Sequence, residues 1–198
     1  MKFVLASHNR KKLAEMQEIL RELGVEVVLQ SDVGLDLEPE ENGTTFAENA
    51  AIKAMAVMQA SGLPAIADDS GLCVDALNGG PGVYSARFGG EGLDDKGRYT
   101  LLLEMLRGQT DRTAHFHTSI VCAFPNGDVL QDDGEVEGTI AFAPMGENGF
   151  GYDPVFFVPD KRKTFAQLSA EEKAEISHRG KALRAFKETL RNYLAEHQ

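Results

Sequence analysis

Two adjacent carboxylates, Asp68 and Asp69, stand in the stretch AIADDSG, directly after a short apolar run. Two ionised carboxylates at this spacing repel each other and resist burial. A cation, a basic side chain or water must offset their charge. Because α/β proteins tend to place ligand sites where strands end, we expect this pair to take part in chemistry.

A second group of acids, Glu38, Glu40 and Glu41, lies in the loop SDVGLDLEPEENG. Mg²⁺ takes oxygen ligands and is usually held by one or two carboxylates together with substrate phosphates. Two carboxylate segments on one chain therefore favour a magnesium site, and a solvated acidic loop is the alternative for the glutamates. Neither segment has the spacing of a calcium loop, and the histidines lack zinc spacing.

The stretch SHNRKK combines neutral donors with three consecutive cations at a predicted strand-to-helix junction. Basic residues in a first helical turn oppose the helix dipole, which makes them unfavourable unless an anion is bound there. The alternative is a Ser or Asn cap beside solvated lysines. No Walker motif and no GxGxxG motif is present, so any phosphate is bound without those loops.

Two later segments could form a pocket for a flat ligand. In GFGYDP, residues 149–154, glycines flank Phe150, and an aromatic ring there could stack on a ligand. The alternative is a strand-entry loop with core aromatics. In EKAEISHRGKAL, residues 172–183, polar side chains between apolar anchors could face a cleft.

Hydrophobic periodicity predicts an α/β fold with a mixed, strongly bent sheet. We expect strands over residues 2–6, 25–30, 113–124 and 134–142. Helices are expected from the basic turn to Gly24, over 45–62 and 94–107, and again towards the C-terminus. Thr45 with Glu48, and Ser169 with Glu172, have the spacing of a capping box, which predicts that helices begin at these two places. Residues 63–77 read as two strands joined by a turn at Ser70 and Gly71. Residues 78–92 are too rich in glycine for regular structure.

The composition is that of a globular protein, with 42% hydrophobic and 26% charged residues among 198. No apolar run reaches the roughly 18–20 residues that span a bilayer, and no signal-peptide core is visible. Cys73 and Cys122 form no CxxC pair and are expected as buried thiols in a reducing cytoplasm. The net charge of −11 argues against nucleic-acid binding, although residues 161–198 carry a net charge of +4.

Five segments, taken together, resemble the inosine triphosphate pyrophosphatase family, which hydrolyses non-standard purine nucleotides such as dITP, ITP and XTP. They are SHNRKK, EENGTTFAENAAIKA, AIADDSGLCVDALNGGPGVYSARFGG, GFGYDPVFFVP and EKAEISHRGKAL. They follow the family's order from residue 7 to residue 183. The resemblance implies one catalytic domain over residues 1–198, with two α/β lobes, a long bent mixed sheet and a central cleft. It also implies a homodimer and a role in cleansing the nucleotide pool.

The resemblance assigns roles residue by residue. Asp69 is expected as the catalytic acid-base residue and a Mg²⁺ ligand, and either Glu40 or Glu41 as the other ligand. The residues expected to bind the triphosphate are Ser7, His8, Asn9, Arg10, Lys11, Lys12 and Lys53, and Ser70 is expected to contact the substrate. Those expected to bind the nucleobase are Phe150, Gly151, Tyr152, Asp153, Lys173, His178 and Arg179.

The expected reaction is attack of water on the α-phosphorus, with Asp69 taking the proton and Mg²⁺ and Lys12 neutralising the leaving pyrophosphate. Donors in the base pocket would donate a hydrogen bond to a 6-keto oxygen but would meet the 6-amino group of adenine as donor against donor, a mismatch that costs about 1–3 kcal/mol. Two alternatives remain: a pyrophosphatase that prefers dTTP or UTP, and a module that senses nucleotides without hydrolysis.

Overall fold

The computed structural model describes all 198 residues and contains one sheet of eight strands. The strands are β1 (Lys2–Leu5), β2 (Glu26–Leu29), β3 (Ala65–Val74), β4 (Gly80–Pro81), β5 (Thr113–Ala123), β6 (Val129–Ile140), β7 (Phe156–Val158) and β8 (Lys163–Thr164). Their order is β2-β1-β3-β5-β6-β7-β8, and β4 pairs with β3. β1 is parallel to β2 and β3, whereas β4, β7 and β8 are antiparallel to their neighbours. The predicted mixed α/β sheet is confirmed.

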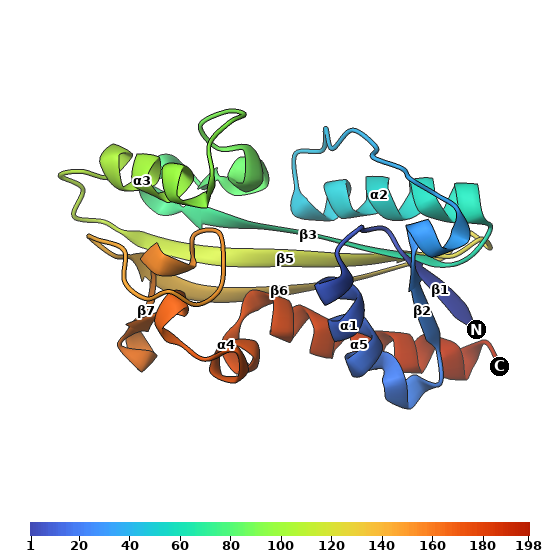
Figure 1. The fold of residues 1–198 in the computed structure, drawn as a ribbon. Helices are drawn as coiled ribbons and strands as arrows, with labels where there is room; N and C mark the ends of the chain where they lie inside the picture. Colours follow the sequence, from blue (N-terminus) through green and yellow to red (C-terminus); the bar gives the residue numbers. More distant parts are fainter. The chain divides into compact units, whose positions relative to one another are not determined.

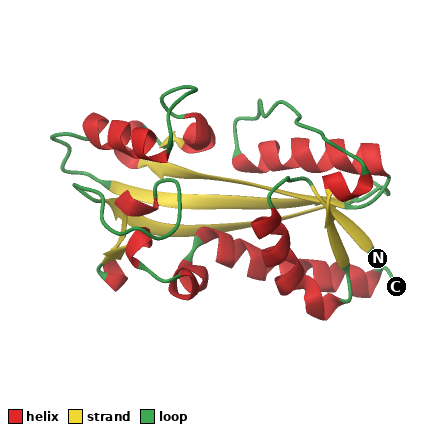
Figure 2. Ribbon diagram, viewed as in Figure 1, coloured by secondary structure: helices red, strands yellow, loops and turns green.

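The α-helices lie on both faces of the strands (Figure 2). They are α1 (Arg10–Leu20), α2 (Phe46–Ser61), α3 (Asp95–Met105), α4 (Ala170–Ile176) and α5 (His178–Glu196). None of them combines the length and the apolar character that a membrane crossing requires.

The chain divides into two compact units. Unit 1 comprises Met1–Asp69, Thr118–Gly134 and Lys181–Gln198, and unit 2 comprises Ser70–His117 and Glu135–Gly180. Three strands, β3, β5 and β6, contribute residues to both units. That these units are two lobes of one catalytic domain with a cleft stays a prediction.

In unit 1, helix α2 lies on one face of the strands, and α1 and α5 lie on the other (Figure 1). Side chains of a strand alternate between the two faces. Ile66 of β3 accordingly packs in one cluster with Met16 of α1 and Phe186 of α5. Its neighbour Ala65 packs in a different cluster with Val57 of α2. Both faces of β3 are therefore buried in this unit.

Aromatic rings dominate the core of unit 2. Phe116, Phe156 and Phe165 are buried, and their ring centroids lie 4.6 to 5.6 Å apart. Leu102 of α3 and Ile176 of α4 belong to the same cluster. This core supports the loop and the short helix α4 that carry the predicted base-binding residues.

The predicted turn at Ser70 and Gly71 is wrong, because β3 runs without interruption from Ala65 to Val74. Both residues favour turns locally, but Gly71 is buried within the strand, and pairing with neighbouring strands outweighs that preference. The glycine-rich stretch also contains more regular structure than expected, namely β4 and a short 3₁₀ helix over Gly82–Arg87. Strand β6 begins at Val129, five residues earlier than predicted.

The predicted starts of α2 and α4 are confirmed. The Thr45 side chain accepts a hydrogen bond from the Glu48 backbone N–H at the start of α2. Glu48 itself accepts from the backbone and hydroxyl of Thr44, so this capping box is shifted by one residue. At α4, Ser169 and Glu172 each accept a hydrogen bond from the other's backbone N–H, which completes the box.

Candidate active site

The adjacent aspartates point to opposite faces of β3 because side chains alternate along a strand. Asp68 shares the face of Ile66, which α1 covers, and its Oδ1 lies 3.2 Å from Lys12 Nζ of α1. Asp69 lies on the α2 face and accepts a hydrogen bond from the Asn49 side chain of α2. The two like charges are therefore separated and compensated by different helices.

Asp69 is held in an unusual state for a carboxyl group. Burial raises its pKa to about 6, against an ordinary value of 3.8. The Lys53 ammonium and the Asn49 hydrogen bond oppose this rise, while the nearby charges of Glu41 and Asp68 add to it. Its Oδ2 atom is buried without a hydrogen-bond partner. A buried carboxylate oxygen without a partner suits a bound cation or water.

Glu41, and not Glu40, is the acid that the fold brings to Asp69. Its Oε1 lies 2.8 Å from Lys53 Nζ, and its charge acts on Asp69. Lys53 Nζ also donates to the backbone carbonyl of Asp68, at 2.6 Å. Glu40 is exposed. Glu41 and Asp69 thus provide the oxygen donors that a magnesium ion prefers, and the unpartnered Oδ2 of Asp69 fits such an ion.

Asn49 is a site residue that the sequence analysis did not single out. It is 1% exposed, and its Oδ1 accepts from the Gly43 backbone N–H at 2.8 Å. It therefore links Asp69 to the end of the acidic loop that carries Glu41. Asn49 and Lys53 are four residues apart and so share a face of α2. A polar residue one turn before a lysine, on a helix face that is otherwise rich in alanine, was the available clue.

The predicted triphosphate turn begins α1, but several of its groups already have partners. The Asn9 side chain accepts from the backbone N–H groups of Lys11 and Lys12, at 2.9 and 3.2 Å. Ser7 Oγ accepts from the Asn9 N–H. The alternative of an Asn cap is therefore realised in this structure. The first turn still has no acidic residue and three basic ones, which favours an anion at this end.

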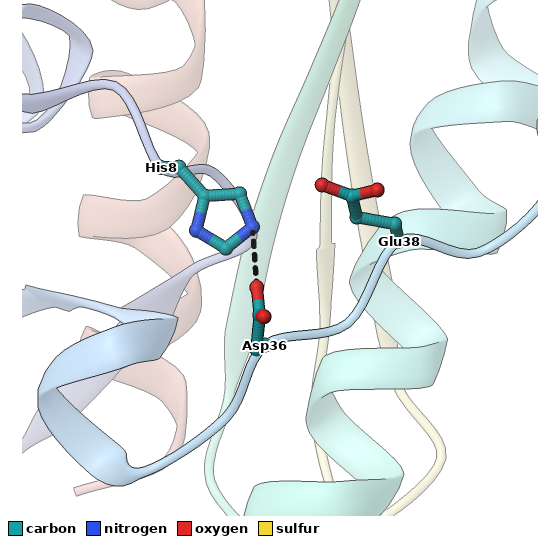
Figure 3. A group of neighbouring side chains, drawn as sticks. All are labelled: His8, Asp36 and Glu38. Atoms are coloured by element: carbon teal, nitrogen blue, oxygen red, sulfur yellow. Dashed lines mark ion pairs between the residues drawn. The ribbon is translucent and has the colours of Figure 1, made fainter.

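Two other residues of this turn face acids. Arg10 lies 4.0 Å from Asp32, and His8 Nε2 lies 3.3 Å from Asp36 Oδ1 (Figure 3). Lys12 forms an ion pair with Asp68 on the α1 face of β3. Ser70 follows Asp69 in β3 and is partly buried.

In unit 2, Lys173 of α4 contacts two other predicted base-binding residues, Asp153 and Phe150. Its Nζ lies 2.6 Å from Asp153 Oδ2 and 4.8 Å from the centroid of the Phe150 ring. Asp153 is 4% exposed, and burial raises its pKa while Lys173 opposes the rise. Phe150 donates its backbone N–H to Asp153, whereas its ring is 74% exposed. An exposed ring beside an ammonium group is able to stack against a flat ligand.

Tyr152 does not offer its ring to a ligand. It is buried in the aromatic core, and its hydroxyl donates to the Ser85 carbonyl at 2.6 Å. For Tyr152 the alternative of a core aromatic therefore holds. Gly151 donates its N–H to Asp95, and His178 stacks on Phe116 at 4.7 Å. Arg179 follows His178 in α5 and is partly buried.

Comparison with known proteins identifies the family. The Ham1 family sequence pattern matches residues 3–189. The chain is 51% identical, over 93% of its length and 94% of the relative's, to the dITP/XTP pyrophosphatase of Exiguobacterium sp.. It is 50% identical to the dITP/XTP pyrophosphatase of Haemophilus influenzae, over 96% and 98% of the two chains. The chain belongs to the Ham1 family. This confirms the family that the five segments predict.

Solved Ham1 structures have the same fold. The Ham1 protein of Staphylococcus aureus matches with a TM-score of 0.93 and 42% identity, over 98% of this chain and all of that one. The HAM1 protein of Coxiella burnetii matches with a TM-score of 0.91 and 46% identity, over 99% of each chain. The Ham1 fold thus extends over nearly the whole chain.

Proposed function

We propose that this Ham1-family protein is a nucleoside-triphosphate pyrophosphatase that hydrolyses dITP, ITP and XTP to the monophosphate and pyrophosphate, and thereby removes these nucleotides from the cellular pool. The observation that carries the proposal is the state of Asp69, a partly buried carboxyl with a pKa of about 6 beside Lys53, Asn49 and Glu41. The relatives named dITP/XTP pyrophosphatases, at about half identity over nearly the full chain, support the substrate class.

In the proposed reaction, Asp69 orients a water molecule and takes its proton as the water oxygen attacks the α-phosphorus. The bond from the α-phosphorus to its bridging oxygen breaks, and that oxygen leaves with pyrophosphate. A base with a pKa near 6 is mostly ionised at neutral pH and is stronger than an ordinary aspartate. Asn49 fixes the orientation of the carboxylate through its hydrogen bond.

Cations of the chain bind the phosphates in this proposal. Lys53 leaves its ion pair with Glu41 and contacts a phosphate oxygen. The basic first turn of α1 supplies further positive charge. Asp69 and Glu41 would hold Mg²⁺, which supplies positive charge to the phosphates when bound. Magnesium dependence is part of this proposal.

The purine is proposed to stack on the exposed Phe150 ring, near Lys173. Lys173 can donate a hydrogen bond to a 6-keto oxygen but cannot accept one from the 6-amino group of adenine. An unpaired buried donor costs about 1–3 kcal/mol, which disfavours ATP by roughly tenfold to a hundredfold.

Phosphorus NMR tests the proposal directly. The purified protein is incubated with ITP and Mg²⁺, and with ATP, GTP, dTTP and UTP in parallel samples. Pyrophosphate together with IMP, and little change in ATP and GTP, is the expected result. Orthophosphate with IDP would contradict attack at the α-phosphorus. Binding of ITP without turnover would instead favour the sensor, and faster turnover of dTTP or UTP would favour the pyrimidine alternative.

The assembly and the location of the protein stay predictions. The family resemblance implies a homodimer, which sedimentation equilibrium of the purified protein measures. A cytoplasmic location also stays a prediction, based on the expectation that Cys73 and Cys122 are reduced thiols.

A further inference from the structure

A buried glutamine lies beside the basic turn and makes three hydrogen bonds. Gln30 follows β2 and is 2% exposed. Its Oε1 accepts from the Leu37 backbone N–H at 3.0 Å, and its Nε2 donates to the Leu37 carbonyl at 3.2 Å. The second hydrogen of Nε2 is directed to His8 Nε2, 3.3 Å away. Both donors and the acceptor of this amide are therefore used.

The contact with Gln30 determines where the neutral His8 ring carries its hydrogen. Because Oε1 of Gln30 accepts from Leu37, the amide presents a donor to His8. His8 Nε2 must then accept, which places the hydrogen of the neutral ring on Nδ1. Asp36 Oδ1 lies 3.3 Å from the same Nε2 and would favour a hydrogen there (Figure 3). Gln30 thus opposes the tautomer that Asp36 favours.

A buried amide holds the acidic loop at each of its ends. Gln30 fixes Leu37 through two hydrogen bonds to its backbone. Six residues later, the Asn49 side chain accepts from the Gly43 backbone N–H at 2.8 Å. The predicted metal ligand Glu41 lies between these two anchored residues. Its position therefore depends on both amides.

Each amide also contacts a part of the site that this loop has to meet. Asn49 forms a hydrogen bond with Asp69, and Gln30 contacts His8 in the basic turn. A pocket of about 310 Å³ adjoins both segments, and its lining includes His8, Gln30, Leu37, Glu41 and Lys53. Without Gln30, the loop would keep its anchor at Asn49 and lose the one beside the basic turn.

We infer that Gln30 is a positioning residue for the reaction. It holds the acidic loop and His8 at a fixed separation, so that Glu41 is in place before Mg²⁺ and the triphosphate bind. A loop that is already ordered adds little ordering cost to binding. Gln30 acts through Leu37 and His8 and does not itself bind the substrate. This inference rests on the proposed function and adds to it a residue outside the predicted site.

Two measurements on the nucleotide-free protein test the positioning without any turnover. Gln30→Met keeps a side chain of similar length and removes all three hydrogen bonds. Amide hydrogen exchange over residues 37–43 should become about tenfold faster in this variant. Nitrogen NMR of the histidine rings at about pH 9, where an ordinary imidazole is neutral, reads the tautomer. We expect the hydrogen of His8 on Nδ1 in the natural protein and on Nε2, facing Asp36, in Gln30→Met. Loss of one of the five histidine signals in His8→Gln identifies His8.

Steady-state kinetics with ITP measures the effect on the reaction. Gln30→Met should raise the KM for ITP and the Mg²⁺ concentration for half-maximal rate about tenfold. Its kcat should change by less than about threefold, because Asp69 and Asn49 are retained and the loss falls on binding. Gln17→Met is the matched control. It removes a glutamine hydrogen bond to the Val27 carbonyl, 3.0 Å long, in the same unit, and should leave every one of these readouts unchanged.

The inference is overturned if Gln30→Met keeps the natural tautomer of His8 or the natural exchange rate over residues 37–43. An equally raised Mg²⁺ requirement in Gln17→Met would also overturn it, since the effect would then be a general loss of stability. If Gln30→Met does not fold, Gln30→Glu replaces it. Glutamate still accepts from the Leu37 N–H but cannot donate when ionised, so the hydrogen of His8 should again move to Nε2. Absence of ITP hydrolysis by the natural protein would reject the proposed function, while the exchange and the ring-nitrogen signals would still decide the positioning.

Discussion

At the scale of single residues, the chemistry depends on a difference between two neighbours of the same type. Asp68 is compensated by Lys12, whereas Asp69 keeps a buried oxygen without a partner and a raised pKa. A carboxyl group whose pKa is raised by folding lowers the stability of the folded protein at neutral pH, where the group is ionised. Function and stability therefore oppose each other at this position.

Asp69→Asn should stabilise the metal-free protein at pH 7.5 by about 1–2 kcal/mol, after discounting for partial exposure. The pKa of Asp69 is about 6 in the folded protein and has the ordinary value of 3.8 in the unfolded chain, so Asp69 keeps its proton up to a higher pH in the folded protein. The free energy of unfolding therefore falls as pH rises from about 4 to about 6. The gain of the variant should be present above pH 6 and vanish below pH 4. Urea unfolding at the two pH values measures it, and turnover should be lost.

Asp68→Asn is the matched control for that prediction. It removes the partner of Lys12 from a buried position, so we expect it to destabilise the protein at pH 7.5 instead. Addition of Mg²⁺ should stabilise the natural protein and leave Asp69→Asn unchanged, because a cation bound only to the folded state adds to its stability. Equal stabilisation of both proteins by Mg²⁺ would contradict a metal role for Asp69.

At the scale of elements, α4 is the structure most dependent on its cap. It has seven residues, which is too short for a helix to persist without supporting interactions. It carries Lys173, which holds Asp153 near the Phe150 ring. The capping box of Ser169 and Glu172 therefore supports the proposed base-binding group.

Ser169→Ala should cost about 1 kcal/mol, lost mainly within α4. Amide hydrogen exchange over Ala170–Ile176 should become about fivefold faster, while exchange in α2 stays unchanged. Glu172→Gln is the control, because glutamine can still accept a hydrogen bond from the Ser169 N–H. Mass spectrometry of peptic fragments measures both variants. Faster exchange throughout the chain would argue against a local effect.

At the scale of the whole molecule, each unit has a core of its own. Phe186 is fully buried in unit 1, and Phe165 is fully buried in unit 2. Phe142 has the same side chain but is 82% exposed, beneath the Arg112 guanidinium. Replacing each of these three phenylalanines with alanine therefore tests the same truncation in three environments.

Phe186→Ala and Phe165→Ala should each lower the free energy of unfolding by about 3–5 kcal/mol, since each leaves a cavity in a packed core. Phe142→Ala should cost less than about 1 kcal/mol, because only an exposed cation–π contact is lost. Urea unfolding at one pH compares the three. A large loss in Phe142→Ala would indicate that this ring is covered in solution.

The sequence was sufficient to predict the family, the α/β fold class and most of the helices. Five segments in order identify the family, and periodic apolar residues predicted α1 and α5, because a helix must bury one face wherever it lies. Capping residues located the starts of α2 and α4 for a similarly local reason. The turn at Ser70 and Gly71 failed because strand pairing, a long-range interaction, outweighed a local preference.

The sequence by itself determined which residue types are available: two adjacent aspartates, an acidic loop, a basic turn and an aromatic loop. Only the tertiary structure decided which of them meet. Because side chains alternate between the two faces of β3, Asp68 faces α1 and Asp69 faces α2. The buried Asn49 connects Asp69 to the loop that carries Glu41. Packing likewise buries Tyr152 and exposes Phe150. These choices depend on which faces of distant segments pack together, and spacing along the chain does not record that.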